Sequence, residues 1–192
     1  MGRIIVDVSV SLDGFMAGPN VSAACPMGEG GDQLHRWLFG ARPSDADSAI
    51  VKRLFAGIGA VVLGRRTFDI GFEERDQQTP FPAPTFVVTH RAKAPLPTSS
   101  GTFTFVTEGA AAAVEQAQAA AAEKNVAVMG GALTQELIRL GLIDELHIHL
   151  IPLLLGDGLR LFDNLGRKQI EFELVETTPS AEVTHLVYRL TK

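Results

Sequence analysis

The stretch Asn125-Val-Ala-Val-Met-Gly-Gly-Ala-Leu-Thr-Gln-Glu-Leu-Ile-Arg-Leu140 predicts a strand, a pair of glycines and a helix in immediate succession. Residues 126–129 are all apolar, which is typical of a strand that is covered on both faces. After Gly130 and Gly131, apolar side chains recur at the spacing of a helix, with polar side chains between them. Thr134 is a candidate cap for this helix. The stretch therefore indicates a parallel strand of an α/β sheet.

Two roles are open for Gly130 and Gly131. Glycine lets the backbone approach a ligand closely, and a helix that begins there presents free N–H groups and its positive dipole end to a phosphate. A tight turn between two packed elements would use the same residues. The glycine pair alone does not separate the two interpretations, and the other corners of the sheet have to be compared with it.

Composition limits the class of protein. The chain has 192 residues, which predicts a single domain over residues 1–192. Its net charge of -5 and the lack of a basic block argue against nucleic acid as a partner. The single cysteine, Cys25, excludes an intramolecular disulfide and a multi-cysteine metal site, and it fits the reducing cytoplasm. We expect no signal peptide and no membrane span, because the first residues already read as a strand and the apolar stretches are short.

Periodicity predicts alternating strands and helices along the chain. The expected strands are residues 3–10, 60–63, 85–89, 102–106, 126–129 and 143–152. The expected helices are residues 30–39 and 44–55, a helix after residue 68, residues 108–124 and the helix after Gly131. A long loop is expected from residue 11 to residue 31, and alternation over residues 169–177 and 182–191 predicts a hairpin. We therefore expect a doubly wound α/β fold with a mostly parallel sheet, closed by a C-terminal antiparallel hairpin.

Three strand ends carry polar corners. They are Gly64-Arg65-Arg66-Thr67, Thr89-His90-Arg91 and Gly130-Gly131. Since the carboxyl ends of parallel strands share one edge of a sheet, these corners can meet there. Together they offer backbone N–H groups, hydroxyls and cations, which suit a pyrophosphate and an additional phosphate, as in NADPH. Each arginine taken alone is more simply a solvated surface charge, and the Gly-x-Gly-x-x-Gly fingerprint of an ordinary dinucleotide site is absent.

Four motifs in this order resemble a known family. They are Ser11-Leu-Asp-Gly14, Gly64-Arg-Arg-Thr-Phe68, Val128-Met-Gly-Gly131 and Pro152-Leu-Leu-Leu-Gly-Asp-Gly158. They resemble the dihydrofolate reductase superfamily, and in particular the C-terminal reductase domain of the bifunctional riboflavin biosynthesis proteins, RibD. The motifs span nearly the whole chain.

The resemblance implies NADPH as the hydride donor. It implies that Gly64, Arg65, Arg66 and Thr67 contact the phosphates, and that Thr89, His90 and Arg91 lie near the 2′-phosphate. Gly130, Gly131 and Ala132 would pass under the pyrophosphate, often with a cis peptide bond between the two glycines. The first strand end and the loop after it would border the nicotinamide and the substrate, with Ser11, Gly14 and Asp157 as substrate-binding candidates.

The sequence departs from dihydrofolate reductase where the substrate is recognised. The tryptophan, proline and acidic residue that open the first helix of those enzymes are replaced by Glu29-Gly-Gly-Asp32. The zinc deaminase motifs of bifunctional RibD are also absent. Asp13 and Asp32 are the candidates for proton delivery or substrate binding. The competing interpretation is a turn residue for Asp13 and for Asp157, and a helix cap for Asp32.

Several functions fit these residues. The leading hypothesis is an NADPH-dependent reductase of a small heterocycle, of pterin, folate or ribosylaminopyrimidine type. The alternatives are a reductase of an unrelated carbonyl or imine compound, and an NADPH-binding dimeric module without turnover. The resemblance also implies a homodimer, with residues 146–150 and the C-terminal hairpin as candidate interfaces. His147 and His149 share one strand face, where packing is favoured over a metal site because no third ligand is evident.

Overall fold

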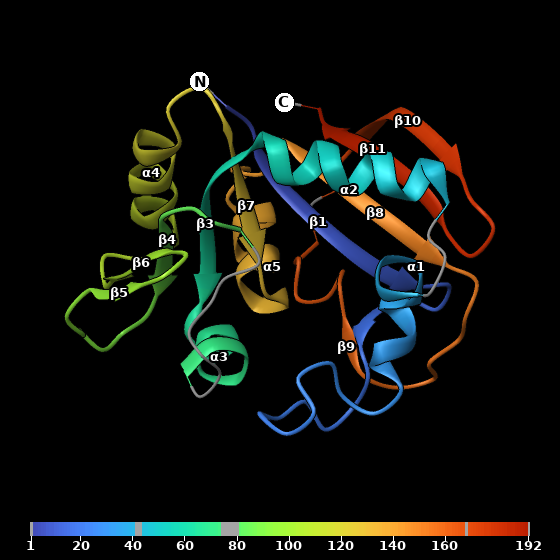
Figure 1. The fold of residues 1–192 in the computed structure, drawn as a ribbon, viewed down its shortest axis with the longest axis horizontal. Helices are drawn as coiled ribbons and strands as arrows, with labels where there is room; N and C mark the ends of the chain where they lie inside the picture. The colour runs from blue at the N-terminus through green and yellow to red at the C-terminus, as the bar shows by residue number, and fades with distance from the viewer. Residues whose placement is uncertain (1, 41–43, 74–80, 168, 192) are drawn as a thin grey trace.

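A nine-stranded sheet dominates the computed structural model, which describes residues 2–40, 44–73, 81–167 and 169–191. Its strands lie in the order β10-β11-β8-β1-β7-β3-β4-β6-β5 (Figure 1). The six strands from β8 to β6 run parallel, and β5, β11 and β10 are joined to them in antiparallel fashion. The expected doubly wound sheet with an antiparallel C-terminal hairpin is confirmed.

The strands have the following bounds: β1 Ile4–Ser11, β2 Phe15–Ala17, β3 Ile58–Gly64, β4 Thr85–Val88, β5 Leu96–Thr98, β6 Gly101–Val106, β7 Asn125–Met129, β8 Glu145–Ile151, β9 Leu159–Arg160, β10 Phe172–Pro179 and β11 Thr184–Leu190. The helices are η1 Gly31–His35, α1 Arg36–Phe39, α2 Asp45–Gly57, α3 Arg65–Phe68, η2 Asp69–Glu73, α4 Ala110–Ala121 and α5 Gly131–Arg139. Three short strands, β2, β5 and β9, lie in segments expected to be loops, and β2 pairs with β9 in a small second sheet.

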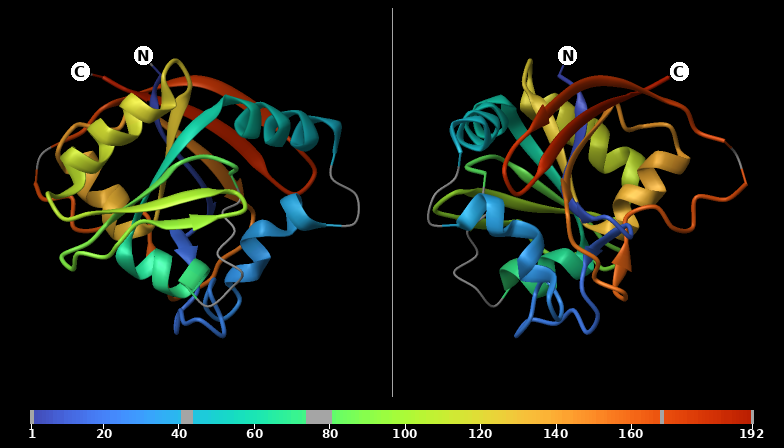
Figure 2. Two further views of the ribbon diagram at one scale, coloured as in Figure 1. Left: turned by 60° about the vertical axis from the view of Figure 1, so that its left-hand side comes forward. Right: turned by 90° about the vertical axis from the view of Figure 1, so that its right-hand side faces the viewer.

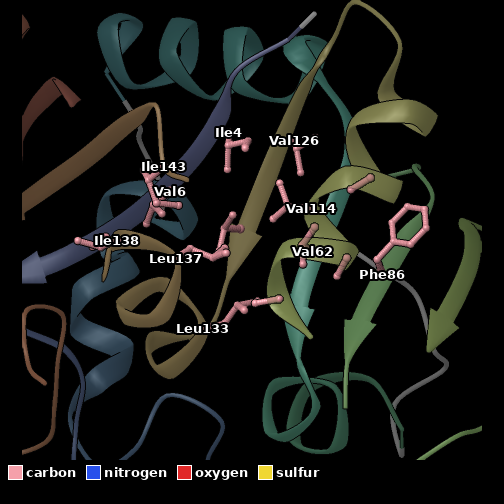
Figure 3. Packing of buried hydrophobic residues seen from close by; sticks show 14 of the residues in the cluster. Ile4, Val6, Val62, Phe86, Val114, Val126, Leu133, Leu137, Ile138 and Ile143 are labelled. Atoms are coloured by element: carbon pink, nitrogen blue, oxygen red, sulfur yellow. The ribbon is translucent and has the colours of Figure 1, made fainter. Parts of the chain in front are cut away.

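Helices cover both faces of the large sheet (Figure 2). On one face α4 and α5 pack against the apolar side chains of the central strands, and Figure 3 shows this cluster around Val62, Val126 and Leu137. On the other face lie η1, α1, α2, α3 and η2, with the aromatic cluster of Phe68 and Phe103 at its centre. Each central strand is therefore buried on both sides, as its apolar sequence requires.

Local capping explains where two helices begin. Ser44 accepts a hydrogen bond from the backbone N–H of Asp47, and the Asp47 carboxylate accepts one from the N–H of Ser44, so the two residues form a capping box for α2. In α5 the cap position is Gly130, whereas Thr134 lies inside the helix and is buried. The prediction that Thr134 caps this helix was wrong, because the helix already starts directly after the glycine.

The central strand β1 has neighbours that lie far away in the sequence. It pairs with β7 on one side and with β8 on the other. The strand predicted at residues 143–152 is thus interior, because β8 is hydrogen-bonded to β1 and to β11 along its length. Residues 146–150 therefore offer no free strand edge to a second subunit, and the edge strand on that side is β10. Their role at a subunit interface stays a prediction.

Candidate functional site

Two neighbouring strands separate at the carboxyl edge of the sheet. Pairing between β1 and β7 ends at Val6 and Val128, but β1 continues beside β8 as far as Ser11 and Ile151. The chain leaves β1 toward the face that carries α2, and it leaves β7 toward the face that carries α5. Ligands of open α/β sheets bind where neighbouring strands connect in opposite directions. The carboxyl ends of β1 and β7 form such a switch point, and we call this edge of the sheet the crevice.

A cleft of about 510 Å³ lies at the same edge, beside the ends of β3 and β4. It is lined by residues of two predicted corners, Gly64 and Arg65 after β3 and Thr89, His90 and Arg91 after β4. Ala132 and Leu133 of α5 form its opposite side. The topology therefore brings all three corners together. Asp69 and Glu136 add two carboxylates to the lining.

The glycine corner is built by close backbone packing. Gly130 has φ +101°, and a Cβ at this position would lie 2.4 Å from Oγ1 of Thr67. A Cβ on Gly131 would lie 3.0 Å from Sδ of Met16. Both values are shorter than ordinary van der Waals contacts, so a side chain at Gly130 would have to displace the Thr67 side chain. The described peptide bonds are all trans, that between Gly130 and Gly131 included, so the cis bond implied by the resemblance is not found.

The two arginines after β3 differ in their surroundings. The Arg65 guanidinium is hydrogen-bonded to Asp69 and lies 3.6 Å from Glu73, and the hydrogen bond to Asp69 raises its pKa further. Its charge is therefore already partly neutralised. Arg66 is exposed and points away from the cleft lining, with one long contact of 3.5 Å to the carbonyl oxygen of Val21. Thr67 lies against Gly130, where its hydroxyl can serve the same corner.

The corner after β4 presents the open cations. His90 and Arg91 are exposed and line the cleft, while Thr89 is buried. The Thr89 hydroxyl accepts a hydrogen bond from the backbone N–H of Arg91 at 3.1 Å, which fixes the turn that carries both cations. Of the predicted cofactor residues, His90 and Arg91 are the cationic pair best placed to meet a phosphate in the cleft.

Asp13 ties two loops together. Its carboxylate accepts hydrogen bonds from the Ser11 hydroxyl at 2.6 Å and from the backbone N–H groups of Leu155 and Gly156 at 3.1 and 2.7 Å. The hydrogen bond from Ser11, followed by those from the backbone, lowers the pKa of Asp13 to about 2. These contacts hold Asp13 as an anion that anchors the loop around residues 153–158 at the end of β1. The geometry fits the structural interpretation of this residue.

The remaining predicted residues lie outside the crevice. Asp32 belongs to the short helix η1 but is exposed, and Gln33 is its hydrogen-bond neighbour at 3.5 Å. Asp157 is exposed and accepts a hydrogen bond from the next backbone N–H, at Gly158, as a turn residue does. Gly14 has φ +87° in the turn between β1 and β2. Neither Asp32 nor Asp157 is brought together with the three corners.

A buried polar chain crosses the sheet on the face covered by α1 and α2. Nε2 of His149 lies 3.1 Å from Oδ1 of Asp7, and Nδ1 of His149 lies 2.7 Å from Nδ1 of His185. Nε2 of His185 then lies 2.8 Å from Oδ1 of Asp47. The indole of Trp37 packs against both imidazoles, with ring centroids 4.5 and 4.9 Å away. We call Asp7, His149, His185 and Asp47 the histidine chain.

Electrostatics in the histidine chain favour ionised carboxylates. Burial raises the pKa of Asp7, but hydrogen bonds and charge attraction from His147 and His149 outweigh burial and bring it to about 2. The pKa of Asp47 is also lowered, since hydrogen bonds from His185, Ser44 and Ser180 outweigh its desolvation. Burial lowers the pKa of His185. His147 is partly exposed, and its contacts with Asp7 and Glu145 overcome burial and raise its pKa.

The sequence profile of the RibD C-terminal domain matches residues 3–186. The chain belongs to the RibD C-terminal domain family. No curated protein matches the sequence.

Solved structures share the fold of this RibD C-terminal domain. A protein proposed to act in riboflavin biosynthesis from Shewanella sp. PV-4 superposes with a TM-score of 0.75 at 23% identity, covering 99% of each chain. RibD from Acinetobacter baumannii gives 0.63 at 17% identity, covering 100% of this chain and 59% of that one. Dihydrofolate reductase from Enterococcus faecalis, complexed with NADP(H), gives 0.58 at 15% identity, covering 98% and 97%. The dihydrofolate reductase-like fold expected from the four motifs is confirmed.

Sequence reasoning missed the histidine chain of this RibD C-terminal domain. Its four residues come from β1, α2, β8 and β11, and no local pattern connects them. Two signals were present in the sequence. Asp7 interrupts an otherwise apolar strand, and His149 and His185 occupy inward positions of alternating strands. In the part of the chain that the structure describes, no helix has the length and apolar character needed to traverse a membrane.

Proposed function

We propose that this RibD C-terminal domain is an NADPH-dependent reductase of a small heterocycle of pterin, folate or ribosylaminopyrimidine type. The observation that carries the proposal is one cleft that is lined by the corners after β3 and β4 and by Ala132 directly after the Gly130–Gly131 corner. Membership of the RibD C-terminal domain family and the fold shared with dihydrofolate reductase support a reductase.

The residues present suit a dinucleotide with an extra phosphate. The Gly130–Gly131 corner leaves no room for a side chain, so its backbone N–H groups and the start of α5 are free to approach a pyrophosphate. Arg91 and His90 would hold the 2′-phosphate that distinguishes NADPH from NADH. Thr67 would contribute a hydroxyl beside the glycines. When bound, the nicotinamide supplies a hydride, which the protein directs by orienting the ring in the crevice.

The substrate side of the crevice is polar. Asp7, Ser9 and Ser11 project from β1 toward the face covered by η1 and α1, and Asp7 keeps 18% of its side chain exposed. Nδ1 of His35 is buried and has no hydrogen-bond partner within the described residues. His35 lies near enough to Asp7 and His149 for their charges to affect its pKa, which burial lowers. A flat heterocycle with ring N–H and carbonyl groups would supply the complementary partners.

Cofactor binding and turnover test the proposal in two steps. Titration with NADPH, followed by its fluorescence, should show saturable binding that is tighter than binding of NADH. Consumption of NADPH at 340 nm is then measured with dihydrofolate, dihydropterins and a ribosylaminopyrimidine phosphate. Oxidation with one of these heterocycles supports the reductase. Binding of NADPH without oxidation in any mixture would favour the module without turnover, and absence of NADPH binding would contradict the proposal.

A further inference from the structure

We infer that His149 and His185 share a single proton between their Nδ1 atoms, and that the histidine chain delivers a proton through Asp7 to the substrate in the crevice. The inference rests on the proposed reductase function for the delivery step. The shared proton itself follows from the contacts alone. The histidine chain includes no residue of the three corners, and it includes neither Asp13 nor Asp32, the two carboxylates that were the candidates for proton delivery.

The contacts fix the number of protons on the two rings. A carboxylate only accepts hydrogen bonds, so Nε2 of His149 and Nε2 of His185 must each carry a proton toward Asp7 and Asp47. Between the two Nδ1 atoms, 2.7 Å apart, a hydrogen bond requires one proton, because two lone pairs or two N–H groups would repel. The pair therefore holds three protons on four nitrogens, which is one imidazolium beside one neutral imidazole.

The surroundings decide which ring is charged. Asp47 accepts hydrogen bonds from the Ser180 hydroxyl and the Ser44 backbone N–H, so its charge is shared among several donors. One carboxylate oxygen of Asp7 is hydrogen-bonded to His149, and Nδ1 of His147 lies 3.7 Å from the other oxygen. Burial and the charge of His149 both lower the pKa of His185. We assign the imidazolium to His149, which then donates to Asp7 and to His185.

The position of Asp7 connects this proton to the crevice. In the register of the sheet, Val6 lies beside Val128, so Asp7 lies level with the last residue of β7, just before the Gly130–Gly131 corner. Of the four residues in the histidine chain, Asp7 has the most exposed side chain, at 18% against 4% for each histidine and 7% for Asp47. The chain thus runs from the interior to the opening between the strands.

The delivery step balances as follows. Reduction of a C=N group adds a hydride to carbon, the π electron pair moves to nitrogen, and nitrogen takes up one proton. The proton leaves Nε2 of His149 and passes by way of the Asp7 carboxylate to that nitrogen. His149 becomes neutral and keeps the Nδ1 proton that it donates to His185. His149 is a positioning residue in this scheme, because it acts through Asp7 and does not touch the substrate.

Other charged groups lie around the histidine chain. His35 on η1 interacts electrostatically with His149 and Asp7. The remaining groups lie around His147 on β8: Glu145 on the same strand, Arg189 on β11, Glu176 on β10 and Arg53 on α2. Glu145 is paired with Arg3 and Arg189, and Glu176 with Arg53. His147 also approaches Asp7, with Nδ1 3.7 Å from Oδ2, but it is not part of the histidine chain, so it provides the matched control for the experiment.

Nuclear magnetic resonance on the full chain with ¹⁵N-labelled histidine tests the shared proton without a ligand. His149→Asn and His185→Asn identify the signals. At pH 7 we expect three protonated ring nitrogens and one acceptor nitrogen in the pair. Two acceptor nitrogens, or four protonated ones, would overturn the shared proton. The protonated ring nitrogens are counted in the spectrum of the wild-type protein, and one folded variant of the two is enough to identify the signals of the pair.

Single-turnover oxidation of NADPH tests delivery, with 7,8-dihydrofolate and a ribosylaminopyrimidine phosphate as acceptors. At pH 7, His149→Asn should slow the hydride step about 100-fold, the low end for loss of a general acid. The wild-type rate should fall as the pair loses its proton at higher pH, and the variant should lose this dependence. His147→Asn should change the rate by less than about threefold, and both variants should bind NADPH like the wild type. A larger loss in His147→Asn, or an unchanged pH profile in His149→Asn, would overturn delivery by His149.

Failure of the proposed function has a different signature. If the wild-type protein does not bind NADPH, or binds it without oxidation, both the reductase function and the delivery role are contradicted. The shared proton is not affected by that result, because the count of ring protons tests it separately. If wild-type turnover is present and only the variants behave otherwise than expected, the reductase stands and the histidine chain is a structural network.

Discussion

At the scale of single residues, the cations around the cleft are unequal. Arg65 already forms ion pairs with Asp69 and Glu73. Arg91 is exposed in the cleft lining, on a turn that Thr89 fixes. Within the part of the chain that the structure describes, Arg91 makes no ion pair, so it can bind a phosphate without breaking an existing one. The cofactor preference is therefore expected to depend on the corner after β4 more than on the corner after β3.

Replacing Arg91 tests this expectation. Arg91→Ala should weaken NADPH binding about 10-fold or more, since a hydrogen bond to a charged group contributes roughly 1.5–3 kcal/mol. NADH, which has no 2′-phosphate, should lose less than about twofold. Lys124→Ala, an exposed cation at the opposite end of β7, is the control and should bind both cofactors like the wild type. Fluorescence titration gives the affinities, and equal losses for the two cofactors would contradict a role at the 2′-phosphate.

Asp7 makes stability depend on pH in the acid range. The pKa of Asp7 is about 2 in the folded protein and about 3.9 in an unfolded chain, so folding favours the ionised carboxylate over the protonated acid. Its contribution, roughly 2 kcal/mol, is fully present above about pH 4 and is lost as the pH falls toward 2. In Asp7→Asn, urea unfolding should show a lower stability at pH 5 and a shallower decline below pH 4. The exposed turn variant Asp157→Asn should keep the wild-type slope, and a wild-type slope in Asp7→Asn would refute the assignment.

At the scale of elements, α4 and α5 each follow a glycine with a similar positive φ. Gly109 before α4 has φ +98°, and Gly130 before α5 has φ +101°. A Cβ on Gly109 would meet no atom within 4 Å, whereas a Cβ on Gly130 would meet the Thr67 hydroxyl. A side chain at Gly109 therefore costs folding free energy only through the positive φ, whereas a side chain at Gly130 adds the contact with Thr67.

Alanine at these two positions gives the comparison. Gly109→Ala should cost about 1–2 kcal/mol of folding free energy from backbone strain alone. Gly130→Ala should cost a further 1–3 kcal/mol from the contact with Thr67, and it should weaken NADPH binding because α3 and α5 are pushed apart. Urea unfolding and NADPH titration measure the two effects. Similar losses in both variants would mean that the corner can relax without disturbing the cleft.

At the scale of the whole molecule, β10 is one of the two edge strands of the large sheet, and β5 is the other. Leu174 and Val175 on this strand are 52% and 44% exposed, next to a β-bulge at the pairing with β11. Unpaired edges with apolar side chains are suited to association with a second sheet edge. We propose that the homodimer implied by the family resemblance forms through the C-terminal hairpin.

A charge on this edge should break the dimer. Leu174→Lys is expected to sediment as a monomer in analytical ultracentrifugation, because the ammonium group would have to be buried between subunits. Leu140→Lys changes a leucine of similar exposure, 54%, after α5 and should remain dimeric. Wild-type protein that sediments as a monomer would contradict the proposal, and so would a dimer of Leu174→Lys.

Much of the architecture was predictable because it is written in local patterns. Apolar runs located the six parallel strands, and the rule that their carboxyl ends share one edge brought Gly64, Thr89 and Ala132 to one cleft. The short strands β2, β5 and β9 were not predicted, because a strand of two or three residues is too short to show an alternating pattern. Asp32 lies on the short helix η1 and Asp157 lies in a turn, and where these two elements sit relative to the cleft depends on tertiary packing. The histidine chain joins residues 7, 47, 149 and 185, and only the folded sheet brings them together.

The placement of β1 has a consequence for how the chain acquires its fold during synthesis. This strand is made before both of its partners, which begin at residues 125 and 145. Pairing over such separations carries a high loop-closure cost and slows folding. An apolar strand of eight residues must therefore wait, unpaired, until most of the polypeptide has left the ribosome. Asp7 places a charge within this waiting segment, where it would hinder self-association before the sheet closes.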